Sequence, residues 1–288
     1  MTREALSAAV DALRAAGVGE PRLDAELLLC EATGWDRARL AVNPDEEIPP
    51  TAARRFGEMV RRRLRREPVA YILGRRGFRH VELAVDPRVL IPRPETELLV
   101  ELALEMAPRR VLDIGTGSGA IALAVAGELP ECEVVATDTS SAALEVARAN
   151  AERLGLAGRI ELVEGALPDS GEFDLVLANL PYVSEAEWGD LEPEVTEWEP
   201  REALLAGPDG LDAIRALLDV RPVTRCLALE VGKGQAEAVG GLMREAGFDR
   251  IEARKDLAGV ERVVVGRSRS ADFVFSGAIG PTTTKSAP

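Results

Sequence analysis

A four-residue segment, Asn179-Leu180-Pro181-Tyr182, follows an apolar run and carries the most informative chemistry in the chain. An asparagine side-chain oxygen and a backbone carbonyl beside a proline can both accept hydrogen bonds, and a tyrosine adds an aromatic face. Together these groups can hold a planar NH2 group for attack on an electrophile. Alone, the segment could equally be a turn with a half-buried tyrosine, so its meaning depends on a second motif.

The second motif is a glycine-rich loop within Val111-Leu112-Asp113-Ile114-Gly115-Thr116-Gly117-Ser118-Gly119-Ala120. The first part predicts a strand, the glycines allow close approach of a ligand, and a helix is expected to begin at Ala120. Asp138 ends the next predicted strand, where a carboxylate can bind both ribose hydroxyls of a nucleotide-type ligand. The predicted cofactor-binding residues are Asp113, Gly115, Thr116, Gly117, Ser118, Gly119 and Asp138.

Two ligand classes are compatible with this loop, a dinucleotide and S-adenosylmethionine. The dinucleotide fingerprint is Gly-x-Gly-x-x-Gly with an open helix N-terminus for the pyrophosphate. Here the spacing is Gly-x-Gly-x-Gly with Asp113 just ahead of it, which favours S-adenosylmethionine. Next to the Asn179 segment, a methyl-donor loop indicates methyl transfer to nitrogen.

The elements that position these motifs form an α/β pattern from residue 95 onward. Short apolar segments alternate with helix-length segments, which predicts a doubly wound, mostly parallel sheet. The predicted strands are Arg110–Ile114, Glu133–Thr137, Ile160–Val163, Phe173–Ala178, Cys226–Glu230 and Val263–Val265. Since ligands bind beyond the carboxyl ends of such strands, we expect Gly115, Asp138 and Asn179 at one edge.

Four segments divide the chain. Residues 1–73 have helical periodicity and predict a small helical bundle. Residues 74–94 contain alternating apolar residues from Phe78 to Val85 and predict a β-hairpin linker. Residues 95–267 form the predicted catalytic domain, and residues 268–288, rich in Ser, Thr, Gly and Pro, predict a disordered tail.

Composition narrows the functional classes. The 288 residues are 46% hydrophobic, enough for a sizeable core, and no run is long and apolar enough to span a membrane. A net charge of −14 repels a phosphate backbone and disfavours direct binding of nucleic acid. Three scattered cysteines without Cys-x-x-Cys spacing predict a cytoplasmic protein with no disulfide and no metal. His80 is the sole histidine, which disfavours Ser/His or Cys/His catalysis. We also expect the protein to be a monomer.

The one basic cluster comprises Arg54-Arg55 and the arginine-rich run at 61–66. A solvated helix face is the simpler interpretation, and we favour it. The alternative is a docking face for an acidic protein or for RNA.

The chain resembles the release factor glutamine methyltransferase family, also called PrmC/HemK, from its N-terminal helices to about Gly266. Besides the two motifs, several strings carry this resemblance, and the first of them is the most family-specific. They are Ile91-Pro92-Arg93-Pro94-Glu95-Thr96, Trp198-Glu199-Pro200-Arg201 and Leu229-Glu230-Val231-Gly232.

The resemblance implies a Rossmann-like class I methyltransferase with a seven-stranded sheet and S-adenosylmethionine as cofactor. It implies that the helical domain recognises peptide chain release factors, and that the glutamine of their Gly-Gly-Gln motif is methylated on its amide nitrogen. The implied catalytic and substrate-binding residues are Asn179, Leu180, Pro181 and Tyr182, with Arg93 added for substrate. Asn179 and Ala166 are added to the cofactor contacts.

Two positions depart from the family pattern. Leu180 stands where the family usually has the first proline of Asn-Pro-Pro-Tyr, but a leucine keeps the backbone carbonyl. Ala166 stands where an acidic or aromatic residue often contacts the adenine, and Glu164 is a candidate replacement. Because Asn-Leu-Pro-Tyr also occurs in methyltransferases of rRNA adenines, an adenine-amino methyltransferase remains an alternative. A cofactor-binding module without catalysis is a second one.

Overall fold

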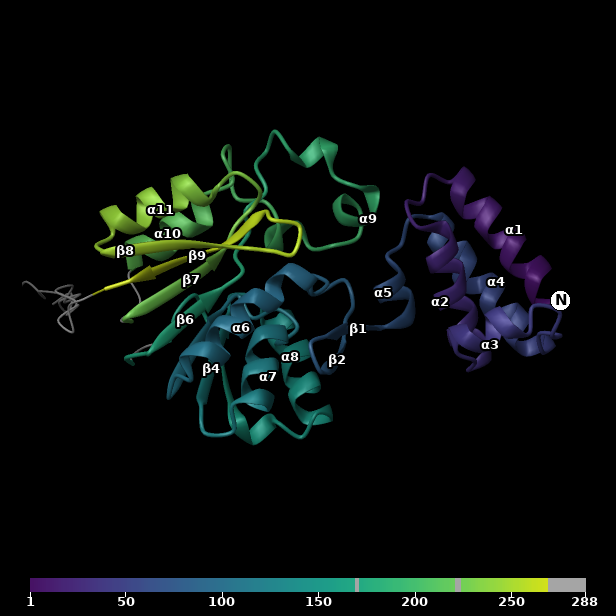
Figure 1. Ribbon diagram of the computed structural model, residues 1–288, viewed down its shortest axis with the longest axis horizontal. Coiled ribbons are helices and arrows are strands. Elements are labelled where there is room, and N and C mark those ends of the chain that lie inside the picture. The colour runs from purple at the N-terminus through teal and green to yellow at the C-terminus, as the bar shows by residue number, and fades with distance from the viewer. Residues whose placement is uncertain (169–170, 221–223, 269–288) are drawn as a thin grey trace, which may run out of the picture.

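The computed structural model describes residues 1–168, 171–220 and 224–268. A group of helices at the N-terminal end connects through a β-hairpin to a larger α/β unit (Figure 1). The predicted tail lies outside the described residues, apart from Ser268. None of the described helices is both long and apolar enough to cross a membrane.

The N-terminal helices enclose a core of their own. They are α1 (Thr2–Ala15), α2 (Pro21–Thr33), α3 (Arg37–Val42), α4 (Pro50–Leu64) and α5 (Val69–Leu73). Leu6, Val10 and Leu13 recur at helical spacing on α1 and are all buried, so the predicted helical periodicity is confirmed for this segment. The two shortest helices, α3 and α5, were not expected, because five or six residues are too few for a periodic pattern to emerge.

The hairpin prediction is confirmed by two antiparallel strands, β1 (Arg75–Phe78) and β2 (Val81–Ala84). Phe78 pairs with Val81, so the turn consists of the two residues between them. Phe78 and Leu83 are fully buried in the same apolar cluster as residues of the large sheet. The hairpin is therefore packed on the α/β unit and is part of its core.

The large sheet has seven strands in the order β5-β4-β3-β6-β7-β9-β8. Its strands are β3 (Arg110–Ile114), β4 (Glu133–Asp138), β5 (Ile160–Glu164), β6 (Leu175–Ala178), β7 (Cys226–Glu230), β8 (Arg250–Lys255) and β9 (Glu261–Arg267). All neighbouring pairs are parallel except the two that involve β9. The predicted doubly wound, mostly parallel sheet is confirmed.

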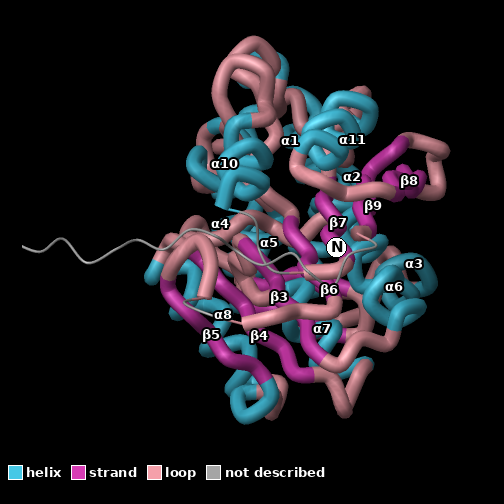
Figure 2. The backbone as a smooth tube through the Cα atoms, turned by 90° about the vertical axis from the view of Figure 1, so that its left-hand side faces the viewer, coloured by secondary structure: helices cyan, strands magenta, loops and turns pink. Residues whose placement is uncertain are grey.

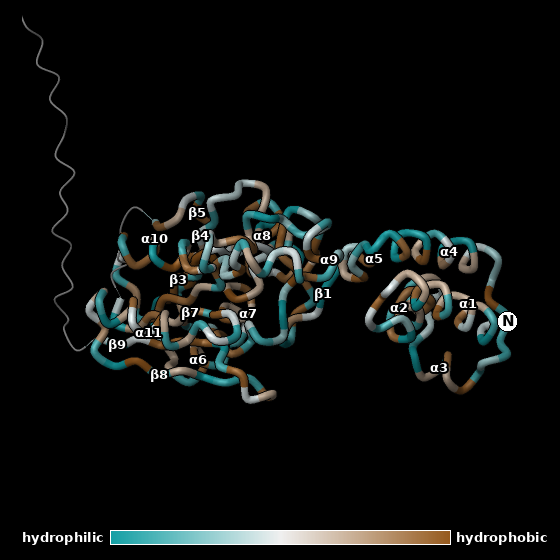
Figure 3. The backbone as a smooth tube through the Cα atoms, turned by 90° about the horizontal axis from the view of Figure 1, so that it is seen from above, coloured by the Kyte–Doolittle hydropathy of each residue, from teal (hydrophilic) through white to brown (hydrophobic). Residues whose placement is uncertain are grey.

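Helices cover both faces of this sheet (Figures 1 and 2). The helices of this unit are α6 (Glu97–Met106), α7 (Ala120–Glu128), α8 (Ser141–Arg153), α9 (Pro193–Thr196), α10 (Asp212–Val220) and α11 (Ala236–Glu245). Buried residues of α6 and α7 share one apolar cluster with the sheet, and those of α10 and α11 share the other. The central strands are accordingly mostly apolar, as the brown stretches near β3 and β7 in Figure 3 show. Burial of both faces fixes the position of the sheet, and the site lies at one edge of this sheet.

Four 3-10 turns complete the described elements. They are η1 (Pro94–Thr96), η2 (Ala157–Arg159), η3 (Trp188–Asp190) and η4 (Arg201–Ala203). η1 matters most for the site, because it leads directly into α6 and carries Thr96, which is buried.

The arginine-rich run was predicted to be a solvated face, and for part of it this was wrong. Arg63 is only 6% exposed and forms ion pairs with Asp24 at 2.7 Å and with Glu194 at 2.6 Å. Arg66 also pairs with Glu194. Glu194 lies on α9, so these arginines connect the helical unit to the long segment that follows Tyr182. A sequence cannot show this, because the acidic partner is more than 100 positions away along the chain.

Candidate active site

The carboxyl ends of four neighbouring strands form the candidate site. Ile114 pairs with Thr137 and Ala178, and Ala178 pairs with Leu229. The residues that follow these strands therefore lie along one edge of the sheet. The edge gathers the glycine loop after β3, Asp138 at the end of β4, Asn179 after β6 and Glu230 at the end of β7.

Backbone hydrogen bonds fix the glycine loop to the neighbouring strand. The amides of Gly115 and Thr116 both donate to the carbonyl of Thr137 at 2.9 Å. Gly117 donates its amide to Asp138 Oδ2 at 2.9 Å, and its φ of +56° is one that glycine adopts readily. No heavy atom lies within 4 Å of where a Cβ on Gly117 would be, so this part of the loop is open to a ligand.

Asp113 lies beneath this loop and is fully buried. Its Oδ2 accepts hydrogen bonds from the Thr116 hydroxyl at 2.7 Å and the Ala122 amide at 3.2 Å, while Oδ1 has no partner. Burial raises the pKa of this carboxyl to about 7. Ser118 is also buried, with its carbonyl accepting from Asn150. The arrangement supports the loop from behind, and direct contact of Asp113 or Ser118 with a cofactor stays a prediction.

Asp138 is partly exposed at the rim of the loop. Its Oδ1 accepts from the Ser140 amide at 2.9 Å, and its Oδ2 accepts from Gly117. These two bonds fix the carboxylate, and each oxygen keeps acceptor capacity for a hydroxyl. Ala166 lies close by, because its carbonyl accepts a hydrogen bond from Thr137 Oγ1 at 3.2 Å.

The Asn179 segment lies directly against the glycine loop. A Cβ built on Gly115 would be 3.4 Å from Leu180 Cδ2 and 3.8 Å from the Asn179 carbonyl. The Asn179 side chain donates from Nδ2 to Thr96 Oγ1 at 3.1 Å. Among the described residues, Asn179 Oδ1 and the Leu180 carbonyl accept no hydrogen bond, so both oxygens can accept one from a ligand.

Tyr182 closes the segment and is held at two points. Its carbonyl accepts a hydrogen bond from Gln235 Nε2 at 2.9 Å, and its hydroxyl donates to Glu230 Oε1 at 3.5 Å. Burial and the Glu230 charge raise the pKa of the Tyr182 phenol above its usual value, so it stays protonated at neutral pH. The phenol is thus a hydrogen-bond donor here.

Glu230 is a buried acid that the sequence reasoning did not select. It is 2% exposed, its Oε2 has no partner, and burial raises its pKa to about 7. Thr96 and Gln235 were likewise not selected. The available signals were weak: Glu230 and Thr96 were noted only as parts of family strings, and an acid directly after an apolar strand was the one local clue.

Arg93, which was predicted to bind substrate, forms an ion pair within the protein. Its guanidinium pairs with Glu199, whose side chain is 2% exposed, and it also donates to the Ile91 carbonyl. The other Glu199 oxygen accepts from the Ile91 amide. This arrangement holds the Pro-rich stretch ahead of Thr96, and contact of Arg93 with substrate stays a prediction.

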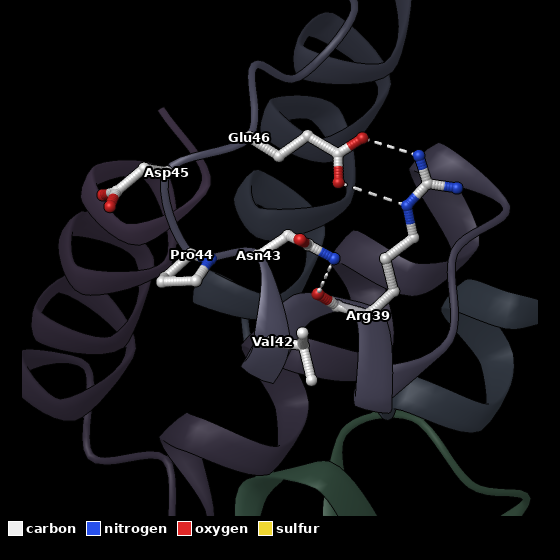
Figure 4. A pocket seen from close by; sticks show the side chains of 6 residues that line it. All are labelled: Arg39, Val42, Asn43, Pro44, Asp45 and Glu46. Carbon is white, nitrogen blue, oxygen red and sulfur yellow. Dashed lines mark hydrogen bonds and ion pairs between the residues drawn. The ribbon is translucent and has the colours of Figure 1, made fainter.

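A separate open hollow of about 600 Å³ lies in the helical unit (Figure 4). It is lined by Arg39, Val42, Asn43, Pro44, Asp45 and Glu46. Arg39 and Glu46 pair with each other across it, so its main charges are already balanced. No group of three or more His, Cys, Asp or Glu side chains suited to a metal ion occurs in the described parts of the chain.

Sequence comparison decides which family has this site. The family model of the PrmC N-terminal domain matches residues 4–74, and that of the methyltransferase small domain matches residues 94–192. The release factor glutamine methyltransferase of Cereibacter sphaeroides is 44% identical over 277 residues, which cover 93% of this chain and 99% of that protein. The chain belongs to the release factor glutamine methyltransferase family.

Other relatives agree with this membership. The protein of the same name from Moorella thermoacetica is 45% identical over 273 residues, covering 90% of this chain and 96% of that protein. Among solved structures, the hMettl16 catalytic domain in complex with a MAT2A 3′UTR hairpin matches with a TM-score of 0.53 and 17% identity. That match covers 64% of this chain and 75% of the other, and at this identity it shows the methyltransferase fold alone.

Proposed function

We propose that this family member transfers the methyl group of S-adenosylmethionine to the side-chain amide nitrogen of the glutamine in the Gly-Gly-Gln motif of peptide chain release factors. The single observation that carries this proposal is the anchored amide of Asn179. Its NH2 is bonded to Thr96, so its oxygen and the Leu180 carbonyl are two acceptors at the point where the glycine loop meets β6. A planar NH2 group is the donor that such a pair accepts.

The residues present also fit the proposed cofactor. Gly117 leaves open space beside the loop, and the fixed carboxylate of Asp138 can accept from ribose hydroxyls. Gly115 to Gly119, Asp138, Ala166 and Asn179 would hold the cofactor. When bound, S-adenosylmethionine supplies an electrophilic methyl group on a positively charged sulfur.

The task of the chain's own residues is to make an amide nitrogen reactive. This nitrogen is a poor nucleophile because its lone pair is delocalised into the carbonyl. Hydrogen bonds from the substrate NH2 to Asn179 Oδ1 and to the Leu180 carbonyl would favour a pyramidal nitrogen with a localised lone pair. The amide nitrogen would take the methyl group as the carbon–sulfur bond breaks and S-adenosylhomocysteine leaves, and it would release one proton to water. Positioning two bound reactants can supply up to roughly 7–11 kcal/mol of the barrier reduction.

Leu180 is compatible with this chemistry. Its contribution is a backbone carbonyl, and its side chain packs on the apolar cluster beneath α10 and α11. The leucine therefore takes part in fixing the loop by packing, where a proline would fix it by ring closure.

The domain roles follow from the same proposal. Residues 1–73 would recognise the release factor, residues 74–94 would link, and residues 95–267 would carry the reaction. The ion pairs of Arg63 and Arg66 with Glu194 support a fixed relation between the helical unit and the segment that follows Tyr182.

The test is transfer of labelled methyl from S-adenosylmethionine to a purified, unmethylated release factor, with RNA in a parallel reaction. Mass spectrometry then locates the methyl group. We expect it on the glutamine of Gly-Gly-Gln. Label in RNA alone would replace the proposal by the adenine-amino alternative, and tight cofactor binding without transfer to either would favour a non-catalytic module.

A further inference from the structure

The segment 192–199, which contains α9, lies between the helical unit and the α/β unit (Figures 1 and 3). Near its start, Glu194 is bound by two arginines of the helical unit. Arg63 pairs with Glu194 Oε1 at 2.6 Å, and Arg66 donates from Nε to the same oxygen at 2.8 Å and from Nη2 to Oε2. The side chains of Arg63 and Glu194 are 7% and 15% exposed, so solvent and salt screen this contact little.

The backbone at Arg66 is adapted to this contact. Arg66 follows Arg65, the C-cap residue of α4, and its φ is +63°. Glycine is the usual residue at such a position, because a Cβ is disfavoured in the left-handed conformation. The arginine side chain bonds Glu194 and also donates to the Ala16 carbonyl at 3.4 Å. The residue that ends α4 therefore joins the helical unit to α9 in spite of an unfavourable backbone conformation.

The far end of the segment is bonded to the Pro-rich stretch that leads to the site. Glu199 pairs with Arg93 and accepts a hydrogen bond from the Ile91 amide at 3.0 Å. This stretch continues into η1, which borders the candidate site. Trp198 donates from Nε1 to the Arg65 carbonyl at 3.3 Å and packs on an apolar cluster with residues of both α5 and α8. The segment is thus held by the helical unit at one end and by the surroundings of the site at the other.

We propose that Glu194 is a positioning residue that sets the affinity for the release factor by holding the helical unit in a fixed place relative to the site. This inference rests on the proposed function, in which the helical unit recognises the release factor and the site takes its glutamine. A substrate that contacts both units binds more tightly when their relative placement is already fixed, because less freedom is lost on binding. The second contact then forms at a high effective concentration.

The experiment compares the wild-type protein with Glu194→Gln on a purified, unmethylated release factor at saturating S-adenosylmethionine. Glutamine keeps the shape of the side chain but removes the charge that Arg63 and Arg66 bind. We expect the KM for release factor to rise about tenfold or more, while kcat stays within about threefold. The Kd for S-adenosylmethionine, measured by calorimetry, should stay within about twofold, because these ion pairs lie outside the glycine loop.

Asp24→Asn and Glu192→Gln are matched controls, since each also removes one negative charge. Asp24 pairs with Arg63 at 2.7 Å but lies on α2, inside the helical unit. Glu192 pairs with Arg66 at 2.8 Å, but its side chain is 73% exposed, and such pairs contribute little. Asp24→Asn should lose stability, and both controls should keep the KM for release factor within about twofold at a temperature where they are folded.

Arg66→Gly breaks the same contact from the other side and keeps the inference testable if Glu194→Gln does not fold. Glycine suits the left-handed backbone at this position, so the loss of the ion pairs is partly offset in the folded state. We again expect a higher KM for release factor with little change in kcat. Arg66→Gly removes a positive charge and Glu194→Gln a negative one, so a rise of KM in both variants excludes a general effect of net charge.

Two results would overturn the inference. One is a KM for release factor within about twofold of wild type in Glu194→Gln, or in Arg66→Gly if only that variant folds. The other is an equal rise of KM in Asp24→Asn. If the wild type itself methylates an atom other than the glutamine amide, the proposed function falls and the positioning role with it. If the wild type methylates glutamine and the KM is unchanged in the variants, only the positioning role falls.

Discussion

Replacing Gly210 by alanine tests whether the placement of the Tyr182 backbone matters for turnover. Gly210 has a φ of +75°, and an added Cβ would lie 2.3 Å from the Tyr182 carbonyl oxygen and 2.8 Å from Gln235 Nε2. Real Cβ atoms do not approach a backbone atom this closely, so the tyrosine carbonyl must move. The movement would break the hydrogen bond that Gln235 donates to it.

Two contributions set the expected loss of stability. A left-handed backbone conformation costs a non-glycine residue about 1–2 kcal/mol, and a lost hydrogen bond costs about 0.5–1.5 kcal/mol. Together they amount to about 1.5–3.5 kcal/mol. Catalysis should suffer to a similar extent, because a misplacement of about 1 Å near reacting atoms can cost about a hundredfold in rate.

Gly234→Ala is the control for Gly210→Ala. Gly234 has a φ of +87°, but no heavy atom lies within 4 Å of its added Cβ. It therefore carries the backbone strain without the collision. Urea unfolding measures the free energy of unfolding, and steady-state kinetics on release factor measures kcat. If the two variants turn over at the same rate, the reasoning about Tyr182 is refuted.

Three further predictions follow from the described contacts. Asn179→Ala should lower kcat about a hundredfold or more while calorimetry still detects S-adenosylmethionine binding, and wild-type-like turnover would exclude its role. Arg63→Met should lower the free energy of unfolding in urea by about 3–5 kcal/mol, because it leaves Asp24 without its buried partner and Glu194 with Arg66 alone; a loss under 1 kcal/mol would contradict this. Asp113 has its pKa raised to about 7, so the folded state binds a proton more tightly than the unfolded state, whose pKa is about 4. Its contribution is fully present below pH about 4 and is lost as pH rises through about 7; Asp113→Asn should flatten this part of a stability-versus-pH curve, and an unchanged slope would show that Asp113 does not titrate there.

Strand prediction succeeded for strands whose two faces are both covered by helices. β3 and β7 have the predicted bounds, because strands covered by helices on both faces are continuous apolar runs that stand out from their flanks. β8 was not predicted. It is an edge strand in which charged residues alternate around Ile251 and Ala253, so it lacks an apolar run, and its pairing with β9 decides its conformation.

The meeting of Gly115, Asp138 and Asn179 at one edge of the sheet was predicted, because it depends on residues that are local in sequence. The glycine loop, Asp138 and the Asn179 segment each follow a strand directly, and parallel strands bring such ends to one edge. Arg93 and the arginine-rich run were harder to interpret, since their partners Glu199 and Glu194 are remote in sequence. A charged residue is predicted to be exposed as long as its ion-pair partner is unknown.

The sequence by itself predicted the mostly parallel sheet and the edge at which Gly115, Asp138 and Asn179 meet. Apolar periodicity and glycine spacing are local properties, so the sequence alone shows them. Only the tertiary structure decided which way the Asn179 amide faces. Its partner Thr96 is 83 positions away along the chain, and the carboxylate of Glu230 is linked to the same segment through the Tyr182 hydroxyl. Which end of the amide donates depends on atoms that the packing of the whole sheet brings together. No single segment of the sequence determines that packing.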